Sequence, residues 1–293
     1  MNPALPTPPT PLRRITNLFG VAACLLLSAC ASGPHIDRTY TSENQDSRAM
    51  FLVLHYTVID WPKSLKVLTT GGQVSAHYLV RDDPVRSYAL VDENRRAWHA
   101  GPSYWAGNAN LNASSIGIEI VNAGYTDSAL GRVYAPFPQK QIDEVILLVK
   151  DIVARHQIRP ERVIGHADIA PGRKQDPGPA FPWKQLADAG IIAWPDAVKV
   201  LERMPLYATL PPDLAWFQEK LAGVGYQVPR DGQLDTRTTD VIATFQMKYR
   251  PADYSGVMDA ETAALLDVVT MPGGMLLARP GEVPAFKPYT PRW

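Results

Sequence analysis

The apolar positions of residues 48–195 follow two periods, one typical of strands and one typical of a helix. Four short apolar runs bounded by turn residues predict β-strands: 51–56, 75–80, 87–91 and 116–121. From Gln139 to His156 the apolar residues instead recur every three and four positions, which predicts an amphipathic helix. A further short strand is expected at 162–164. Strands mixed with helices predict an α/β fold with a central mixed β-sheet flanked by helices.

The isoleucines of the strand expected at 116–121 recur at every second position. Ile116, Ile118 and Ile120 fall on one face of this strand, whereas Glu119 falls on the other. We therefore expect the isoleucines to pack against a helix. The carboxylate of Glu119 is expected to point to the opposite side of the sheet.

Residues 205–270 form a second unit with an internal repeat. The run that begins at Gly232 matches the run that begins at Gly256: a glycine, an apolar residue, an aspartate and, three residues later, a threonine. An aspartate in this place caps a helix by accepting backbone N–H bonds. With a further helix expected at 214–221, the unit is predicted to be a small three-helix domain. The proline-rich tail, 271–293, shows little pattern and is assigned no structure.

Residues 1–29 have the features of an export signal rather than of a folded segment. Arg13 and Arg14 precede an apolar stretch, 19–27, that is too short to span a bilayer as a stable helix. The stretch ends in Leu-Ser-Ala-Cys, which resembles a bacterial lipobox and implies cleavage before Cys30 and a lipid on its thiol. The alternative is a simple secretory signal with an incidental cysteine.

Lipidation at Cys30 would make residues 30–47 a tether, because they are small, polar and without periodicity. Ala31 follows the cysteine where an aspartate could stand, which by analogy with such lipoproteins predicts the outer membrane, on the side that faces the periplasm. The other cysteine, Cys24, would leave with the signal. Cysteine can then serve the mature chain neither as a nucleophile nor as a metal ligand.

The charge of the chain argues against one class of partner. The full chain has 29 basic and 29 acidic residues, and loss of Arg13 and Arg14 with the signal leaves 27 basic residues against 29 acidic ones. A nearly neutral protein without basic clusters is a poor candidate for nucleic-acid binding. We therefore expect no nucleic acid among its partners.

The loop from Gly165 to Gly178 concentrates residues of chemical use. It combines His166 and Asp176 with further charged side chains and with prolines and glycines that fix a loop. A second histidine, His55, lies near the end of an expected strand. Two histidines and an acid at strand ends supply the three protein ligands of an open zinc site, whose fourth position holds water.

Five short runs within residues 48–195 carry a resemblance to a known family, and they occur in this order: His55-Tyr56-Thr57, Val74-Ser75-Ala76-His77-Tyr78, Trp98-His99-Ala100-Gly101, Ser115–Ile120 and the loop from His166 to Asp176. Together they resemble the zinc-dependent N-acetylmuramoyl-L-alanine amidases of type 2. The repeat in the second unit resembles the peptidoglycan-binding domain type 1, a three-helix module. Both resemblances point to one polymer, to which the lipobox would deliver the chain.

The resemblance to the amidases implies a set of site residues and a reaction. One zinc ion would be bound by His55, His166 and Asp176, and Glu119 and Lys174 would be the catalytic residues. The reaction would be hydrolysis of the amide between N-acetylmuramic acid and L-alanine, in peptidoglycan or muropeptides, during cell-wall turnover or recycling. Contacts to the substrate are assigned to four residues: His99, Asn122, Asp168 and Arg173. Asp168 could instead support a metal ligand.

Two other functions stay open on the sequence alone. The fold could serve a non-catalytic peptidoglycan receptor, although a complete ligand set with Glu119 and Lys174 favours catalysis. The same zinc chemistry could also cleave an amide within the stem peptide. The second unit is expected to raise the local substrate concentration. Deletion of residues 205–293 should then weaken binding to intact sacculi more than cleavage of small muropeptides.

Overall fold

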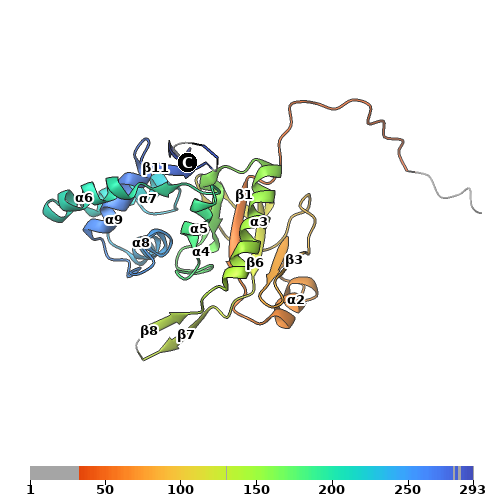
Figure 1. The fold of residues 1–293 in the computed structure, drawn as a ribbon, viewed down its shortest axis with the longest axis horizontal. Helices are drawn as coiled ribbons and strands as arrows, with labels where there is room; N and C mark the ends of the chain where they lie inside the picture. The colour runs from red at the N-terminus through yellow and green to blue at the C-terminus, as the bar shows by residue number, and fades with distance from the viewer. Residues whose placement is uncertain (1–32, 130, 280, 283–284, 293) are drawn as a thin grey trace, which may run out of the picture. The chain divides into compact units, whose positions relative to one another are not determined.

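A computed structural model gives the fold of the protein (Figure 1). The residues described are 33–129, 131–279, 281–282 and 285–292. The chain divides into two units, Met1–Gln45 and Asp46–Trp293, and the described part of the first has neither helix nor strand. The predicted signal peptide and Cys30 lie outside the described residues. Within the described part of the chain, no helix has the length and apolarity that crossing a bilayer requires.

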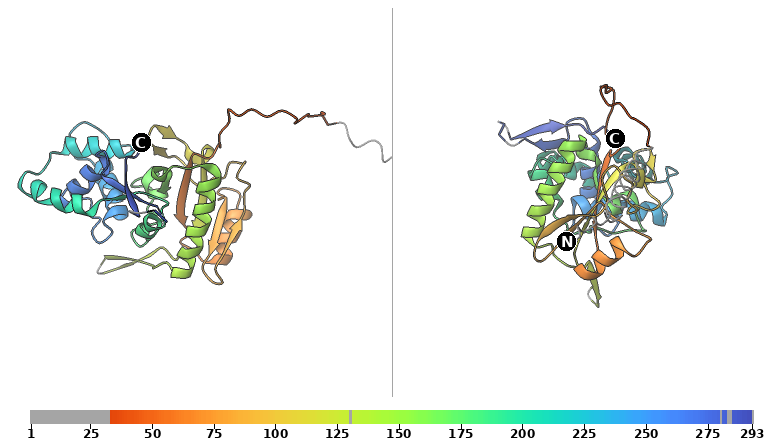
Figure 2. Two further views of the ribbon diagram at one scale, coloured as in Figure 1. Left: turned by 45° about the horizontal axis from the view of Figure 1, so that its top comes forward. Right: turned by 90° about the vertical axis from the view of Figure 1, so that its right-hand side faces the viewer.

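A five-stranded mixed sheet lies at the centre of the second unit (Figures 1 and 2). Its strands are β1 (Phe51–Tyr56), β2 (Tyr78–Arg81), β3 (Arg86–Ala89), β6 (Ser115–Ile120) and β9 (Val163–Gly165), in the spatial order β3-β2-β6-β1-β9. The strand β3 runs antiparallel to β2, and the other pairs are parallel. The predicted fold class is confirmed, and all five predicted strands exist with ends shifted by at most three residues.

Helices cover both faces of the sheet. Helix α3 (Gln139–His156) has the predicted bounds and lies along one face of the sheet (Figure 2). Its apolar residues pack there against the isoleucines of β6. Helix α2 (Trp61–Thr69), which the sequence analysis does not predict, packs through Leu68 against Leu79 on the other face. The alternation of β6 thus leaves Glu119 on the face away from α3, as predicted.

The C-terminal module consists of four helices: α6 (Ala197–Thr209), α7 (Leu214–Val224), α8 (Thr236–Tyr249) and α9 (Ala260–Thr270). The aspartates of the sequence repeat cap two of them, as predicted. Asp235 accepts the backbone N–H of Thr238 at 2.8 Å, and Asp259 accepts that of Thr262 at 2.8 Å. The remaining short elements are β4 (Tyr104–Trp105), β5 (Asn108–Ala109), β7 (Tyr125–Ser128), β8 (Gly131–Tyr134), α4 (His166–Ile169), α5 (Trp183–Asp188) and the 3₁₀ helices at Leu111–Ala113 and Pro160–Arg162.

Besides α2 and the short elements above, two further segments have structure that the sequence did not predict. Helix α6 fills the connection between the two predicted domains, although Pro205 lies inside it. The absence of structure assigned to residues 271–293 is wrong, because β11 (Met275–Ala278) pairs antiparallel with β12 (Phe286–Tyr289) and with β10 (Trp194–Pro195). Such short strands gain their order from pairing and packing with distant parts of the chain, which local pattern does not show.

The sheet region and the C-terminal module share one hydrophobic core. Phe51 of β1 and Trp105 of β4 belong to the same buried cluster as Phe217 of α7 and Phe245 of α8. Trp105 also meets Tyr226 edge to face, with ring centroids 4.9 Å apart. Residues Asp46–Trp293 therefore form one compact unit rather than two bodies joined by a linker.

Candidate active site

Three possible metal ligands meet at the carboxyl ends of β1 and β9. The Nδ1 atom of His55 lies 2.9 Å from Nδ1 of His166 and 3.0 Å from Oδ2 of Asp176. The Nδ1 atom of His166 lies 3.0 Å from the same carboxylate oxygen. All three residues are buried. Their three ligand atoms all lie within 4.8 Å of one another. In the described part of the chain, no other group of three or more His, Cys, Asp or Glu residues comes together in this way.

The fold brings these ligands together through strand pairing and one short loop. The strands β1 and β9 are parallel neighbours, so His55 and His166 reach the same edge of the sheet. The backbone N–H of Ala167 donates to the carbonyl of Asp176 at 2.8 Å, which closes the loop between the second and third ligands. The carbonyl of Ala100 lies 3.0 Å from Nε2 of His166. This contact favours the tautomer with its proton on Nε2, which leaves Nδ1 free to bind a metal ion.

The donor set suits zinc in atom type and in protonation state. Two imidazole nitrogens and one carboxylate oxygen are common zinc ligands, and three of them leave one coordination position open. Burial, followed by the charge of His166, lowers the pKa of His55 to about 4, so this ring is neutral at pH 7. Burial opposes ionisation of Asp176, but His166 and His55 outweigh it and hold its pKa below the usual range. Metal binding requires neutral histidines and an ionised carboxylate.

Glu119 lies beside this cluster with a free carboxyl oxygen. It is the register partner of His55 across β6 and β1, so both side chains project from the same face of the sheet. Its Oε2 atom is buried and has no hydrogen-bond partner among the residues that the structure describes. Burial, and then the charge of Asp176, raises the pKa of Glu119 well above its usual range, whereas Lys174 opposes this shift. A buried carboxyl group with a high pKa beside a ligand cluster suits a general base.

A cleft of about 240 Å³ opens next to the cluster. Its polar wall contains His99, Glu119, His166, Lys174 and Asp176, and its apolar wall includes Val58, Val67, Val74 and Trp98. Substrate sites typically combine an apolar lining with a few converging polar groups. The structure therefore gathers both predicted catalytic residues and two of the three predicted ligands around one opening, with His55 buried behind them.

The apolar wall of the cleft was not predictable from the sequence. The four wall residues named above are each at least 40% exposed. Their positions in turns and at the surface of α2 follow no strand or helix period. Val74 and Trp98 fall within two of the runs that resemble the amidases, whereas Val58 and Val67 lie outside these runs.

His99 both lines the cleft and supports a ligand. Its Nδ1 lies 3.0 Å from Nε2 of His55, and its Nε2 lies 3.1 Å from the hydroxyl of Ser115. The ring lies against β6 at Gly117, where a Cβ atom would come within 2.4 Å of its Cγ. Gly117 is therefore required for this ring position. A partner on the distal nitrogen of a ligating histidine fixes its orientation.

The other three residues that the resemblance assigns to substrate binding do not lie on the wall of this cleft, and their contacts to substrate stay a prediction. The amide of Asn122 donates to the backbone that precedes α3. The carboxylate of Asp168 accepts hydrogen bonds inside the protein. The guanidinium of Arg173 donates to two carbonyls in the segment 100–102. Each polar group is bound by the protein itself.

Comparison with known proteins agrees with this site. The family model for N-acetylmuramoyl-L-alanine amidases matches residues 45–179, and the model for a peptidoglycan binding domain matches residues 211–266. The N-acetylmuramoyl-L-alanine amidase AmiD of Escherichia coli (strain K12) is 45% identical over 264 residues, which are 85% of this chain and 95% of that protein. The chain belongs to the N-acetylmuramoyl-L-alanine amidase family. This amidase is therefore a hydrolase, as the sequence predicts.

Two solved structures extend the likeness through the C-terminal module of the amidase. The complex of E. coli AmiD with the substrate anhydro-N-acetylmuramic acid-L-Ala-D-γ-Glu-L-Lys is 44% identical, with a TM-score of 0.72, and covers 81% of this chain and 94% of that one. AmpDh3 from Pseudomonas aeruginosa, in complex with an anhydromuramic pentapeptide, is 39% identical, with a TM-score of 0.73. The match covers 80% of this chain and 96% of the AmpDh3 chain. Each of these two solved chains thus matches this amidase over nearly its full length.

Proposed function

We propose that this protein hydrolyses the amide between N-acetylmuramic acid and L-alanine with one zinc ion held by His55, His166 and Asp176. The observation that carries the proposal is the meeting of these three buried ligand atoms beside the free Oε2 of Glu119. Membership of the amidase family supports this scissile bond over an amide within the stem peptide. Two related structures hold anhydromuropeptides, which supports muropeptides with this sugar as substrates.

Glu119 and Lys174 have different roles in the proposed reaction. A bound zinc ion lowers the pKa of a water ligand to about 7 and polarises a carbonyl group. Glu119 takes a proton from the attacking water and passes it to the alanine nitrogen as the C–N bond breaks. Lys174 places its positive charge where the carbonyl oxygen becomes negative, and this charge acts on Glu119 from the same wall.

The products of a defined muropeptide test this function. Free stem peptide with L-alanine at its N-terminus is the expected product, and a chelator should abolish its release. Binding of the muropeptide without cleavage would instead favour a receptor. A cut within the stem peptide would favour an endopeptidase.

We further propose that a lipid on Cys30 anchors the protein to the outer membrane, facing the periplasm. The run Leu-Ser-Ala-Cys supports this anchor, and so does the location of peptidoglycan, the polymer that the chemistry requires. Cys30→Ala is expected to move the protein from the membrane fraction to the soluble fraction. Retention of this variant in the membrane fraction after a high-salt wash would contradict the lipid anchor.

A further inference from the structure

A buried ion pair connects the C-terminal module to the loop that bears two metal ligands. The Nζ atom of Lys248, in α8, lies 3.1 Å from Oδ2 of Asp168, two residues after His166. Tyr226, which follows α7, donates its hydroxyl to Oδ1 of the same carboxylate at 2.7 Å. The carboxylate also accepts the backbone N–H of Gly165 at 2.8 Å. Asp168 thus links the module to the residue directly before the ligand His166.

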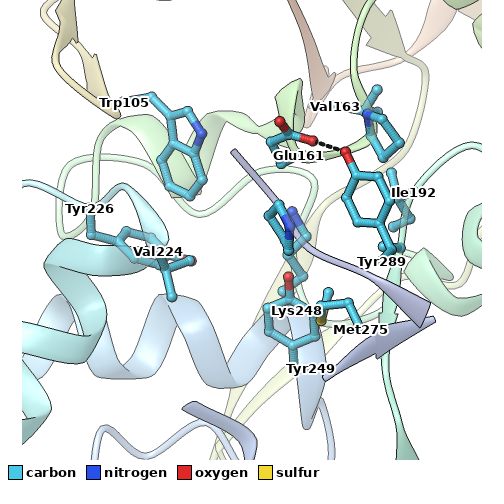
Figure 3. Close-up of a pocket in the computed structure, with 13 residues that line it drawn as sticks. Trp105, Glu161, Val163, Ile192, Val224, Tyr226, Lys248, Tyr249, Met275 and Tyr289 are labelled. Carbon is cyan, nitrogen blue, oxygen red and sulfur yellow. Dashed lines mark hydrogen bonds between the residues drawn. The ribbon is translucent and has the colours of Figure 1, made fainter. Parts of the chain in front are cut away.

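The interior position of this link makes it energetically important. Asp168, Tyr226 and Lys248 are each less than a tenth exposed. Figure 3 shows Tyr226 and Lys248 at one small interior cavity, which Trp105 also lines. Removal of one partner from a buried ion pair leaves a charge without compensation, and such a charge is strongly unfavourable. The turn that holds Asp168 would then shift toward water, and it would carry His166 with it.

Helix α8 approaches the rest of the same loop as well. At Gly172 (φ +74°) a Cβ atom would come within 2.2 Å of the carboxylate of Asp240, so the helix lies directly against the loop. Met247, two residues before the end of α8, and Pro177, next to the ligand Asp176, line a second small cavity together. Helix α8 therefore lies close to the loop near His166, at Gly172 and next to Asp176.

We propose that the C-terminal module positions the zinc ligands, with Asp168, Lys248 and Tyr226 as positioning residues for His166 and Asp176. This inference rests on the proposed zinc site. It assigns to the module a task other than binding the cell wall. It also replaces the expectation that loss of residues 205–293 weakens binding to intact sacculi more than cleavage of small muropeptides. Cleavage of small muropeptides should fall as well, because the loop needs α8 whatever the size of the substrate.

The variant Lys248→Met tests this proposal, because it keeps most of the side-chain volume and removes the ammonium group. Zinc affinity is measured by competition with a chromogenic chelator, at a temperature well below the Tm of every variant. We expect zinc binding to weaken by about 10–100-fold, as for other partners that orient metal ligands. Turnover should fall at limiting zinc and recover at high zinc, whereas KM should stay unchanged.

The module offers a matched control in Lys220→Met. Lys220 pairs with Asp267 at 2.9 Å and lies 5.3 Å from the ring centroid of Trp216, both within the module. Lys248 likewise lies 4.3 Å from the ring centroid of Trp183. We expect Lys220→Met to lower Tm and to leave zinc affinity unchanged.

Two further variants keep the proposal open to refutation if Lys248→Met does not fold. Tyr226→Phe removes one hydrogen bond to Asp168 and should weaken zinc binding less than Lys248→Met but in the same direction. Lys248→Arg keeps the charge and should restore most of the affinity. Zinc affinities of Lys248→Met and Tyr226→Phe equal to that of Lys220→Met would overturn the positioning role. If the proposed zinc site itself is wrong, the wild-type protein will bind no zinc, and this result is distinct from a loss of affinity in the variants alone.

Discussion

Replacement of Glu119 by glutamine is expected to lower kcat on a muropeptide by about 10²–10⁴-fold with the zinc content unchanged. Glutamine keeps the shape of the side chain but cannot accept a proton from the attacking water. The carboxyl group is positioned for this task, because Oε2 has no partner in the described part of the protein and lies on the same face as His55. Steady-state kinetics with metal analysis of the same sample measure both quantities.

Glu144→Gln provides the control for this substitution. Glu144 lies on α3, on the opposite face of the sheet, and accepts a hydrogen bond from Ser87. We expect its replacement to leave turnover close to that of the wild type. Full turnover in Glu119→Gln would remove the general base from the mechanism. Loss of zinc from this variant would indicate that Glu119 binds the metal instead.

Asp176→Ala is expected to lose zinc and activity together. Asp176 supplies the only carboxylate among the three ligands, and without it only two imidazole rings remain. Because three protein ligands are typical of a catalytic zinc site, removal of one should leave the dialysed protein with little bound metal. Metal analysis after dialysis, together with muropeptide turnover, gives the result.

Lys174→Ala separates catalysis from metal binding in the same loop. We expect this variant to keep its zinc and to lose about 10²–10³-fold in kcat, the usual effect of removing one charge-stabilising group. Turnover near that of the wild type would make Lys174 a surface residue without a catalytic role. Full zinc content in Asp176→Ala would contradict the assignment of that carboxylate as a ligand.

The parts of the fold that depend on local pattern were predictable from the sequence. The bounds of α3 follow from its apolar period, and the face of Glu119 follows from the alternation along β6. The structure confirms that His55, His166 and Asp176 meet, since strand ends and a turn-rich loop place them at one edge of the sheet. Their role as ligands remains a proposal that the substitutions above test.

The parts that depend on distant neighbours were not predictable. The partners of Asp168 and Arg173 within the protein could not be predicted, because a charged side chain in a loop has the same sequence signature whether it binds a ligand or the protein. One partner of Asp168 is Lys248, which lies 80 residues away in another helix. The hairpin of the tail likewise depends on pairing with β10, which lies far upstream.

Mass spectrometry of the products from one defined anhydromuropeptide tests the central claim most directly. The protein without residues 1–30 is incubated with this substrate alone, with a chelator, and with the chelator followed by zinc. The account predicts free stem peptide with an N-terminal L-alanine, no cleavage under chelation, and recovery with zinc. Release of the same peptide at an undiminished rate from metal-free protein would contradict it.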